Sequence, residues 1–94
     1  MIRRRVVVYG DVQGVFFRDS CRRVATEQRV NGWVRNLPDG SVEAVFEGEP
    51  DAVFRLIEWA KHGPRSAIVD GVDVHEEEFE HLVSFEIRPS LWRA

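Results

Sequence analysis

The stretch GWVRNLPDGSVEAVFEG, residues 32–48, predicts a β-hairpin near the middle of the chain. Two short runs rich in β-branched and aromatic residues, 32–36 and 41–47, flank the turn sequence Pro38-Asp39-Gly40. Proline presets φ and glycine accepts a positive φ, so this tripeptide has a physical reason to turn the chain. Apolar residues occupy every second position of 41–47, and one face of this strand is therefore expected to be buried.

An amphipathic helix is expected on each side of this hairpin. From about residue 18 to residue 29, apolar side chains recur at helical spacing, and Asn31-Gly32 is a typical stop signal. The second helix spans about 50–62. It opens on a proline that suits the first helical turn, and Gly63-Pro64 ends the pattern.

Strands at the two ends of the chain complete the pattern. Residues 5–10 and 66–77 have strand character, and the alternating residues of 83–87 predict a short last strand. The order is β-α-β-β-α-β with a short fifth strand near the C-terminus, which is the ferredoxin-like arrangement of the α+β class. We therefore expect one domain over residues 1–94, with an antiparallel sheet of four to five strands and two helices on one face. Binding modules and enzymes share this fold, so function must be argued from the site.

The composition argues against several classes of partner. The chain has 94 residues and a net charge of −3, with a pI of about 5.6. This balance argues against non-specific binding of nucleic acid or of an acidic membrane. No apolar run approaches the roughly 20 residues of a membrane span, and the run behind the N-terminus is too short for a signal-peptide core. The single cysteine, Cys21, fits a reducing compartment, so a cytoplasmic protein is expected, and nothing demands more than a monomer.

The histidines and the charged runs give no sign of a metal site or a cofactor. None of the three histidines has the spacing of a metal ligand. We expect the acidic run 76–80 to be a solvated loop and the arginine run 3–5 to be a solvated terminus. A second option is that these arginines add positive potential near a pocket for an anionic substrate.

The segment VYGDVQGVFFR, residues 8–18, has the features of an anion-binding loop. A glycine-containing loop that leads into a helix presents several backbone N–H groups at one point, where the helix dipole adds positive charge. Arg18 falls where the helix begins, so its guanidinium can close over the same anion. A simple turn with a solvated arginine explains the segment equally well. No Gly-Lys-Ser/Thr follows that would make it a Walker A loop.

Taken together, the two segments resemble the two signatures of the acylphosphatase family. The first corresponds to Val8-x-Gly10-x-Val12-Gln13-Gly14-Val15-x-Phe17-Arg18, and the second to Gly32-Trp33-Val34-Arg35-Asn36 followed by Gly40, Val42 and Gly48. The resemblance covers the whole chain and implies hydrolysis of acyl phosphates to a carboxylate and inorganic phosphate. It also implies that Arg18 binds the phosphate and that Asn36 orients the attacking water. The phosphate-binding residues would be Gln13, Gly14, Val15, Phe16, Phe17 and Arg18.

The chemistry of this reaction suits these residue types. The leaving group is a carboxylate whose conjugate acid has a pKa of roughly 4, so it departs without a general acid. Phosphoryl transfer then needs mainly positioning and stabilisation of the phosphate oxygens, and we expect no metal and no cofactor. Taken alone, Asn36 is better explained as a cap of the strand end, and it is the pairing of the two motifs that favours the catalytic role.

Two other functions are compatible with the predicted fold. The alternative to an enzyme is a non-enzymatic ferredoxin-like module that binds an anion or regulates a partner, although intact Arg18 and Asn36 favour the enzyme. An RNA-binding module of the same topology would need exposed aromatic and basic residues on the central strands. Residues 41–47 do not supply them.

Overall fold

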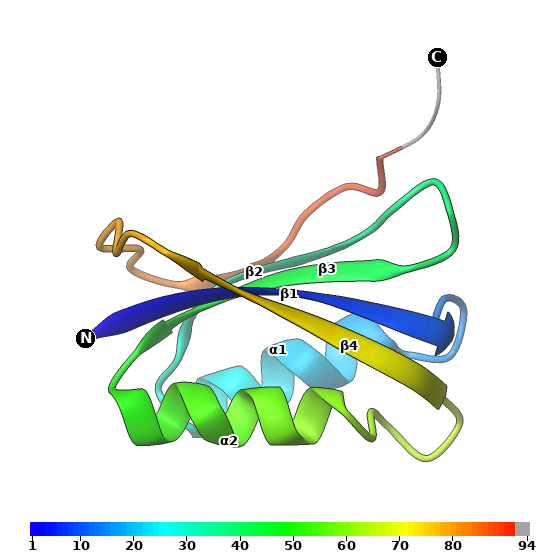
Figure 1. The fold of residues 1–94 in the computed structure, drawn as a ribbon, viewed down its shortest axis with the longest axis horizontal. Coiled ribbons are helices and arrows are strands. Elements are labelled where there is room, and N and C mark those ends of the chain that lie inside the picture. The colour runs from blue at the N-terminus through cyan, green and yellow to red at the C-terminus, as the bar shows by residue number, and fades with distance from the viewer. Residues whose placement is uncertain (92–94) are drawn as a thin grey trace.

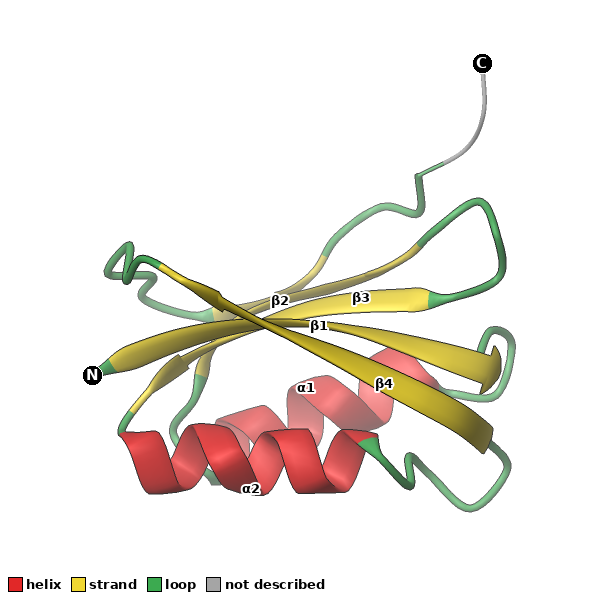
Figure 2. Ribbon diagram, in the orientation of Figure 1, coloured by secondary structure: helices red, strands yellow, loops and turns green. Residues whose placement is uncertain are grey.

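The computed structural model describes residues 1–91, which form five strands and two helices. They are β1 (Ile2–Asp11), α1 (Phe17–Glu27), β2 (Asn31–Asn36), β3 (Val42–Gly48), α2 (Pro50–Ala60), β4 (Ile68–Glu77) and β5 (Phe85–Ile87). The strands form one twisted sheet, and both helices lie on the same face of it (Figure 1). Figure 2 shows the two layers, with the connecting loops gathered at the two ends of the sheet. The predicted α+β, ferredoxin-like fold is confirmed.

The sheet has the strand order β4-β1-β3-β2-β5. Four strands pair antiparallel, as predicted: β1 pairs with both β3 and β4, and β2 pairs with β3. The fifth strand differs, because β5 pairs parallel with β2, from Gly32 opposite Phe85 to Val34 opposite Ile87. Its direction follows from the path of the chain. Strand β4 ends at the end of the sheet where β2 begins, and residues 78–84 cross that end before β5 starts (Figure 1).

The apolar stripes of both helices pack against one face of the sheet, as their spacing predicts. Each large apolar side chain that is fully buried contributes about 1.5–3 kcal/mol, so this layer is the main source of stability. The buried residues of this layer include Val6, Val8, Val34, Val42, Ala44 and Phe46 from the sheet and Phe17, Cys21, Ala25, Val53, Leu56, Ile57 and Ala60 from the helices.

Helix α1 ends at Glu27, slightly before the predicted boundary. Arg29, rather than a glycine or an asparagine, takes the left-handed conformation after the helix, with φ 58°. Asn31 and Gly32 therefore belong to β2. A Cβ on Gly32, at φ 147°, would lie 1.8 Å from Val45 O, so only glycine lets β2 approach β3 this closely. Within residues 1–91, no helix has the length and apolarity needed to cross a membrane.

The face of the sheet opposite the helices is buried at its centre, along β3. All residues of β3 are buried, including Glu43 and Glu47. Arg3 reaches across this face and pairs with Glu47 at 3.1 Å and with Glu77 at 2.9 Å. Arg5 pairs with Glu77 at 3.1 Å. The prediction that the arginine and acidic runs are solvated is therefore wrong for these residues, because they face each other on neighbouring strands.

Candidate active site

A pocket of about 310 Å³ opens where the loop after β1, the start of α1 and the end of β2 meet. These elements lie at one end of the sheet, on the right in Figure 1. Arg18 and Asn36 both line this pocket, so the fold brings the two sequence motifs together. The other lining residues are Val12, Gly14, Phe16, Phe17, Asp19 and Ile87.

The loop after β1 leaves a row of backbone amides without protein acceptors. Gly14 and Phe16 both take positive φ values, 74° and 62°. Within residues 1–91, the first amide of this segment to donate a hydrogen bond is that of Ser20, to Phe16 O at 3.1 Å. The preceding amides lie at the start of α1, where the helix dipole favours negative charge. Free N–H groups at the start of a helix form a binding site for an anion such as phosphate.

Arg18 is the second residue of α1, and its charge is not neutralised by the protein. Its Nη1 donates to Ser90 Oγ at 3.4 Å. No carboxylate within residues 1–91 forms an ion pair with it, whereas Arg3, Arg5 and Arg35 all pair with glutamates. The guanidinium can therefore bind an external anion without first breaking an ion pair.

Asn36 is the last residue of β2 and is only 7% exposed. Its Oδ1 is buried and has no hydrogen-bond partner within the described residues. An unsatisfied buried acceptor costs about 1–3 kcal/mol, and such groups are rare in native proteins. The backbone of Asn36 is held in place, because its carbonyl accepts a hydrogen bond from the Leu91 amide at 3.0 Å. The strand end is thus fixed while its side-chain oxygen is left without a partner.

Gln13 ties the anion-binding loop to the turn that follows Asn36. Its Nε2 donates to Leu37 O at 2.8 Å and to Ser41 O at 2.9 Å. The turn is stiffened further by Asp39, whose carboxylate accepts hydrogen bonds from the Ser41 hydroxyl and amide. These hydrogen bonds hold the pKa of Asp39 below its usual value. Because the Gln13 side chain is engaged with the turn, this residue can contribute to an anion site through its backbone.

A second anchor holds the loop from the opposite side. The hydroxyl of Ser66, in the segment between α2 and β4, donates to Val15 O at 2.9 Å. Val15 packs its side chain against the core. The carbonyl and side chain of Val15 are thus both engaged, which restrains the backbone of the loop around the free amides.

The predicted site residues fall into two groups. The pocket is lined by five of them: Gly14, Phe16, Phe17, Arg18 and Asn36. The other two, Gln13 and Val15, anchor the loop through their hydrogen bonds to neighbouring segments. Three residues at or beside the pocket were not singled out from the sequence: Asp19, Ile87 and Ser90. Ile87 and Ser90 reach the site because β5 pairs with β2, and their positions depend on that pairing. Asp19 directly follows Arg18 in the chain, and Val12 was quoted only as part of the first motif.

The remaining candidates for chemistry lie outside this site. Cys21 is fully buried in the core, and burial raises the pKa of its thiol far above the usual range, which makes it unreactive. In residues 1–91, no three side chains of His, Cys, Asp or Glu are grouped so that they could hold a metal ion.

Comparisons with known proteins point to one family for this chain. A family model described as Acylphosphatase matches residues 4–87. An acylphosphatase of Gloeobacter violaceus is 55% identical over 86 residues, which are 92% of this chain and 92% of that protein. An acylphosphatase of Rubrobacter xylanophilus is 63% identical over 75 residues, covering 80% of this chain and 68% of that protein. The solved structure of an acylphosphatase from Coxiella burnetii superposes with a TM-score of 0.89 at 44% identity, covering 93% of this chain and 92% of that one.

Proposed function

This chain belongs to the acylphosphatase family, and we propose that it hydrolyses the carboxyl–phosphate bond of acyl phosphates with Arg18 and Asn36 as its catalytic residues. One observation carries the assignment of these roles. A single pocket combines a guanidinium that has no ion-pair partner, amides without acceptors and a buried amide oxygen without a partner.

The phosphoryl group is bound by Arg18 and by the backbone amides of residues 13–18. The amides supply neutral donors from one side, and the guanidinium can give two parallel hydrogen bonds from another. These donors stabilise the negative charge that is spread over the phosphate oxygens in the transition state. Donors that are fixed before the substrate arrives need no reorganisation during the reaction, which is the main source of such stabilisation.

Asn36 orients the attacking water. An asparagine side-chain oxygen accepts hydrogen bonds but cannot remove a proton at neutral pH, so its role is positioning. Rotation about the soft terminal torsion of the side chain turns Oδ1 toward a water in the pocket. Its unsatisfied acceptor then gains the hydrogen bond that the protein does not provide.

The leaving group explains why these few residues can be sufficient. Attack of water forms the new P–O bond while the bridging P–O bond breaks and its electron pair goes to the carboxylate. The products are a carboxylate and dihydrogen phosphate, so both protons of the water remain on the phosphate. A carboxylate is a stable anion at neutral pH, with a conjugate-acid pKa of roughly 4, and needs no general acid. We extend the proposal to metal-independent turnover by a cytoplasmic monomer, in keeping with a buried, unreactive thiol and a net charge of −3.

The test is release of inorganic phosphate from benzoyl phosphate in the presence of EDTA. We expect turnover by the wild-type protein and a loss of about 10³-fold or more in Arg18→Ala. Arg22→Ala is the matched control, because Arg22 lies on the same helix but is exposed outside the pocket, and it should retain activity. Absence of turnover in a folded wild-type protein would favour the anion-binding module. Turnover that is lost in EDTA and restored by added metal would contradict metal independence.

A further inference from the structure

Phe16 occupies a position that disfavours phenylalanine in three ways. Its backbone is left-handed, with φ 62° and ψ 24°, which is rare for a bulky residue and favours glycine or asparagine. It is the N-cap of α1, where serine, threonine, aspartate or asparagine would bond to a free amide, and it makes no such bond. Its side chain is 74% exposed. Local energetics therefore do not explain this residue.

The neighbouring phenylalanine provides an informative contrast. Phe17 is buried in the core, and its ring lies 5.1 Å from the ring of Trp59. Packing explains Phe17 completely. Within residues 1–91, Phe16 forms no pair with another aromatic ring, although it lines the pocket next to Arg18. Its one distinctive environment is the rim of the active site.

The chemistry of the substrate indicates what this rim contacts. The phosphate is bound by Arg18 and the loop amides in this proposal, and the acyl carbon is two bonds from the phosphorus, so the acyl group must lie close to the same loop. The apolar lining of the pocket comes from Val12, Phe17 and Ile87, with Phe16 at the exposed edge. An exposed aromatic ring can stack with another aromatic ring or cover an apolar chain.

We propose that the ring of Phe16 is the contact surface for the acyl group and selects acyl phosphates with aromatic or large apolar acyl groups over acetyl phosphate. This inference rests on the proposed function. The left-handed backbone belongs to the loop that leaves the amides free, and the same bend holds the side chain of residue 16 at the mouth of the pocket. Phosphate binding and acyl selection thus come from the backbone and the side chain of one residue.

The test compares kcat/KM for benzoyl phosphate and acetyl phosphate in the wild type and in Phe16→Asn. Asparagine tolerates the left-handed backbone and suits the N-cap, so this variant should be at least as stable as the wild type. We expect the ratio of the two kcat/KM values, benzoyl over acetyl, to fall about tenfold. Phe54→Asn is the control, because Phe54 is 48% exposed on α2, outside the pocket, and its ratio should equal that of the wild type.

Each outcome of this experiment decides one point. An unchanged ratio in an active Phe16→Asn overturns the inference and leaves the proposed function intact. An equal loss with both substrates also overturns it, because damage to the loop lowers both rates without changing their ratio. Failure of the proposed function is distinguishable, because the wild type would then release no phosphate from either substrate.

Discussion

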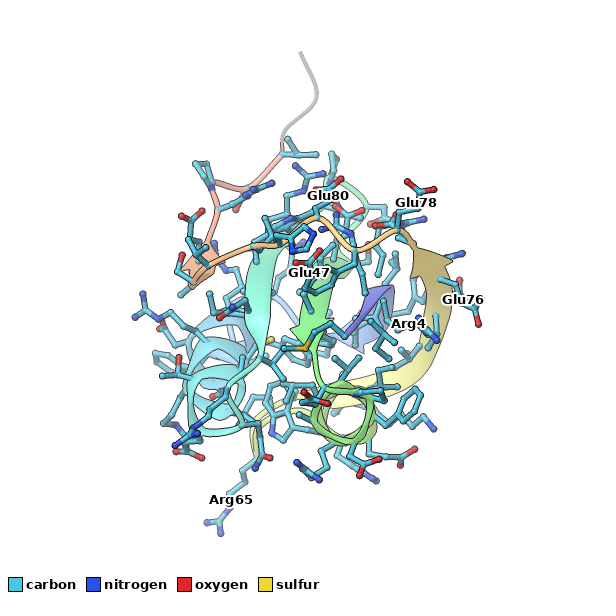
Figure 3. All side chains as sticks on the ribbon, turned by 90° about the vertical axis from the view of Figure 1, so that its left-hand side faces the viewer. Arg4, Glu47, Arg65, Glu76, Glu78 and Glu80 are labelled. Carbon is cyan, nitrogen blue, oxygen red and sulfur yellow. The ribbon has the colours of Figure 1, made fainter. Side chains whose placement is uncertain are left out.

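Asn36 and Glu47 are both buried polar residues of the central hairpin, and they lie at its opposite ends. Asn36 ends β2 beside the start of β3, whereas Glu47 pairs with Asn31 at the other end. The carboxylate of Glu47 is 1% exposed and accepts three hydrogen bonds: from the amides of Glu80 and Leu82, at 2.7 and 2.8 Å, and from Arg3 at 3.1 Å. Figure 3 shows Glu47 beneath the loop that carries Glu80. Asn36 Oδ1 has no partner at all in the described residues.

The difference distinguishes a polar residue that stabilises the fold from one whose acceptor remains without a partner, as the proposed role of Asn36 requires. Burial of Glu47 opposes its ionisation, but the two amides and Arg3 outweigh that effect and hold the pKa of Glu47 below its usual value of 4.5. Its hydrogen bonds attach residues 78–84, which lead into β5, to the end of the sheet. At the other end the fold leaves donors and an acceptor unpaired, at a cost in stability that a bound substrate and water can recover.

Among the variants that test this comparison, the largest expected effect is the loss of turnover when Asn36 is replaced. Asn36→Ala should lower turnover about 10²–10³-fold, as loss of one oriented polar group does in other enzymes. Its unfolding free energy should not fall, because the substitution removes a buried acceptor that had no partner, and lost side-chain packing offsets part of the gain of about 1–3 kcal/mol. The first quantity is measured as phosphate release from benzoyl phosphate, and the second by urea denaturation.

Asn31→Ala is the matched control for this substitution. Asn31 is the same residue type on the same strand, but its Nδ2 donates to Leu82 O at 2.8 Å, at the end of the sheet where Glu47 lies. This variant should lose stability and retain turnover. A large loss of stability in Asn36→Ala, or near wild-type turnover, would contradict the distinction between the two ends.

Replacing Glu47 should produce the opposite result. Glu47→Gln removes the charge that compensates Arg3 and brings a donor toward the Glu80 and Leu82 amides, so we expect a loss of about 3 kcal/mol in unfolding free energy. Turnover of the folded protein should remain, because the pocket lies at the other end of the sheet. Glu76→Gln is the control: this carboxylate is 84% exposed and pairs with Arg4 at 3.6 Å at the rim (Figure 3). It should have little effect.

Comparing wild type with Glu47→Gln also predicts in which direction their difference in stability changes with pH. Arg3 and then Arg5 hydrogen-bond the Glu77 carboxylate and keep its pKa below 4.5, in the same direction as that of Glu47. A carboxylate whose pKa is lower in the native state stabilises the fold at pH values above its unfolded pKa. This stabilisation is lost as the pH falls through the native-state pKa. The stability difference between wild type and Glu47→Gln should therefore be constant above about pH 4.5 and shrink below it. A difference that grows on acidification would show that Glu47 is not ionised in the fold.

The two ends also differ in how far the sequence predicts them. The hairpin, both helices and the order of the elements along the chain follow from alternation, helical spacing and Pro38-Asp39-Gly40, all of which are local patterns. Arg18 lies in a loop with the features of an anion site, but the roles of Arg18 and Asn36 were predicted from the resemblance of the two paired motifs to the acylphosphatase family. Glu47 was not found, because its partners come from residues 3 and 80–82, and only the sheet brings those segments to β3. Local patterns cannot show that a glutamate has three distant donors.

Gln13 resembles Glu47 in joining two segments by side-chain hydrogen bonds, but it lies at the end of the sheet that carries the pocket. Its replacement has the smallest expected effect. Its two hydrogen bonds join the anion-binding loop to the turn after Asn36. Gln13→Met keeps the length of the side chain without its donors, and we expect about a tenfold loss in kcat/KM because a shift of about 1 Å in such a site is costly. If Gln13 acts by positioning Asn36 against the phosphate loop, the double variant with Asn36→Ala should lose less than the sum of the two single effects on a free-energy scale. Additive losses would mean that Gln13 stabilises its loop independently of the water held by Asn36.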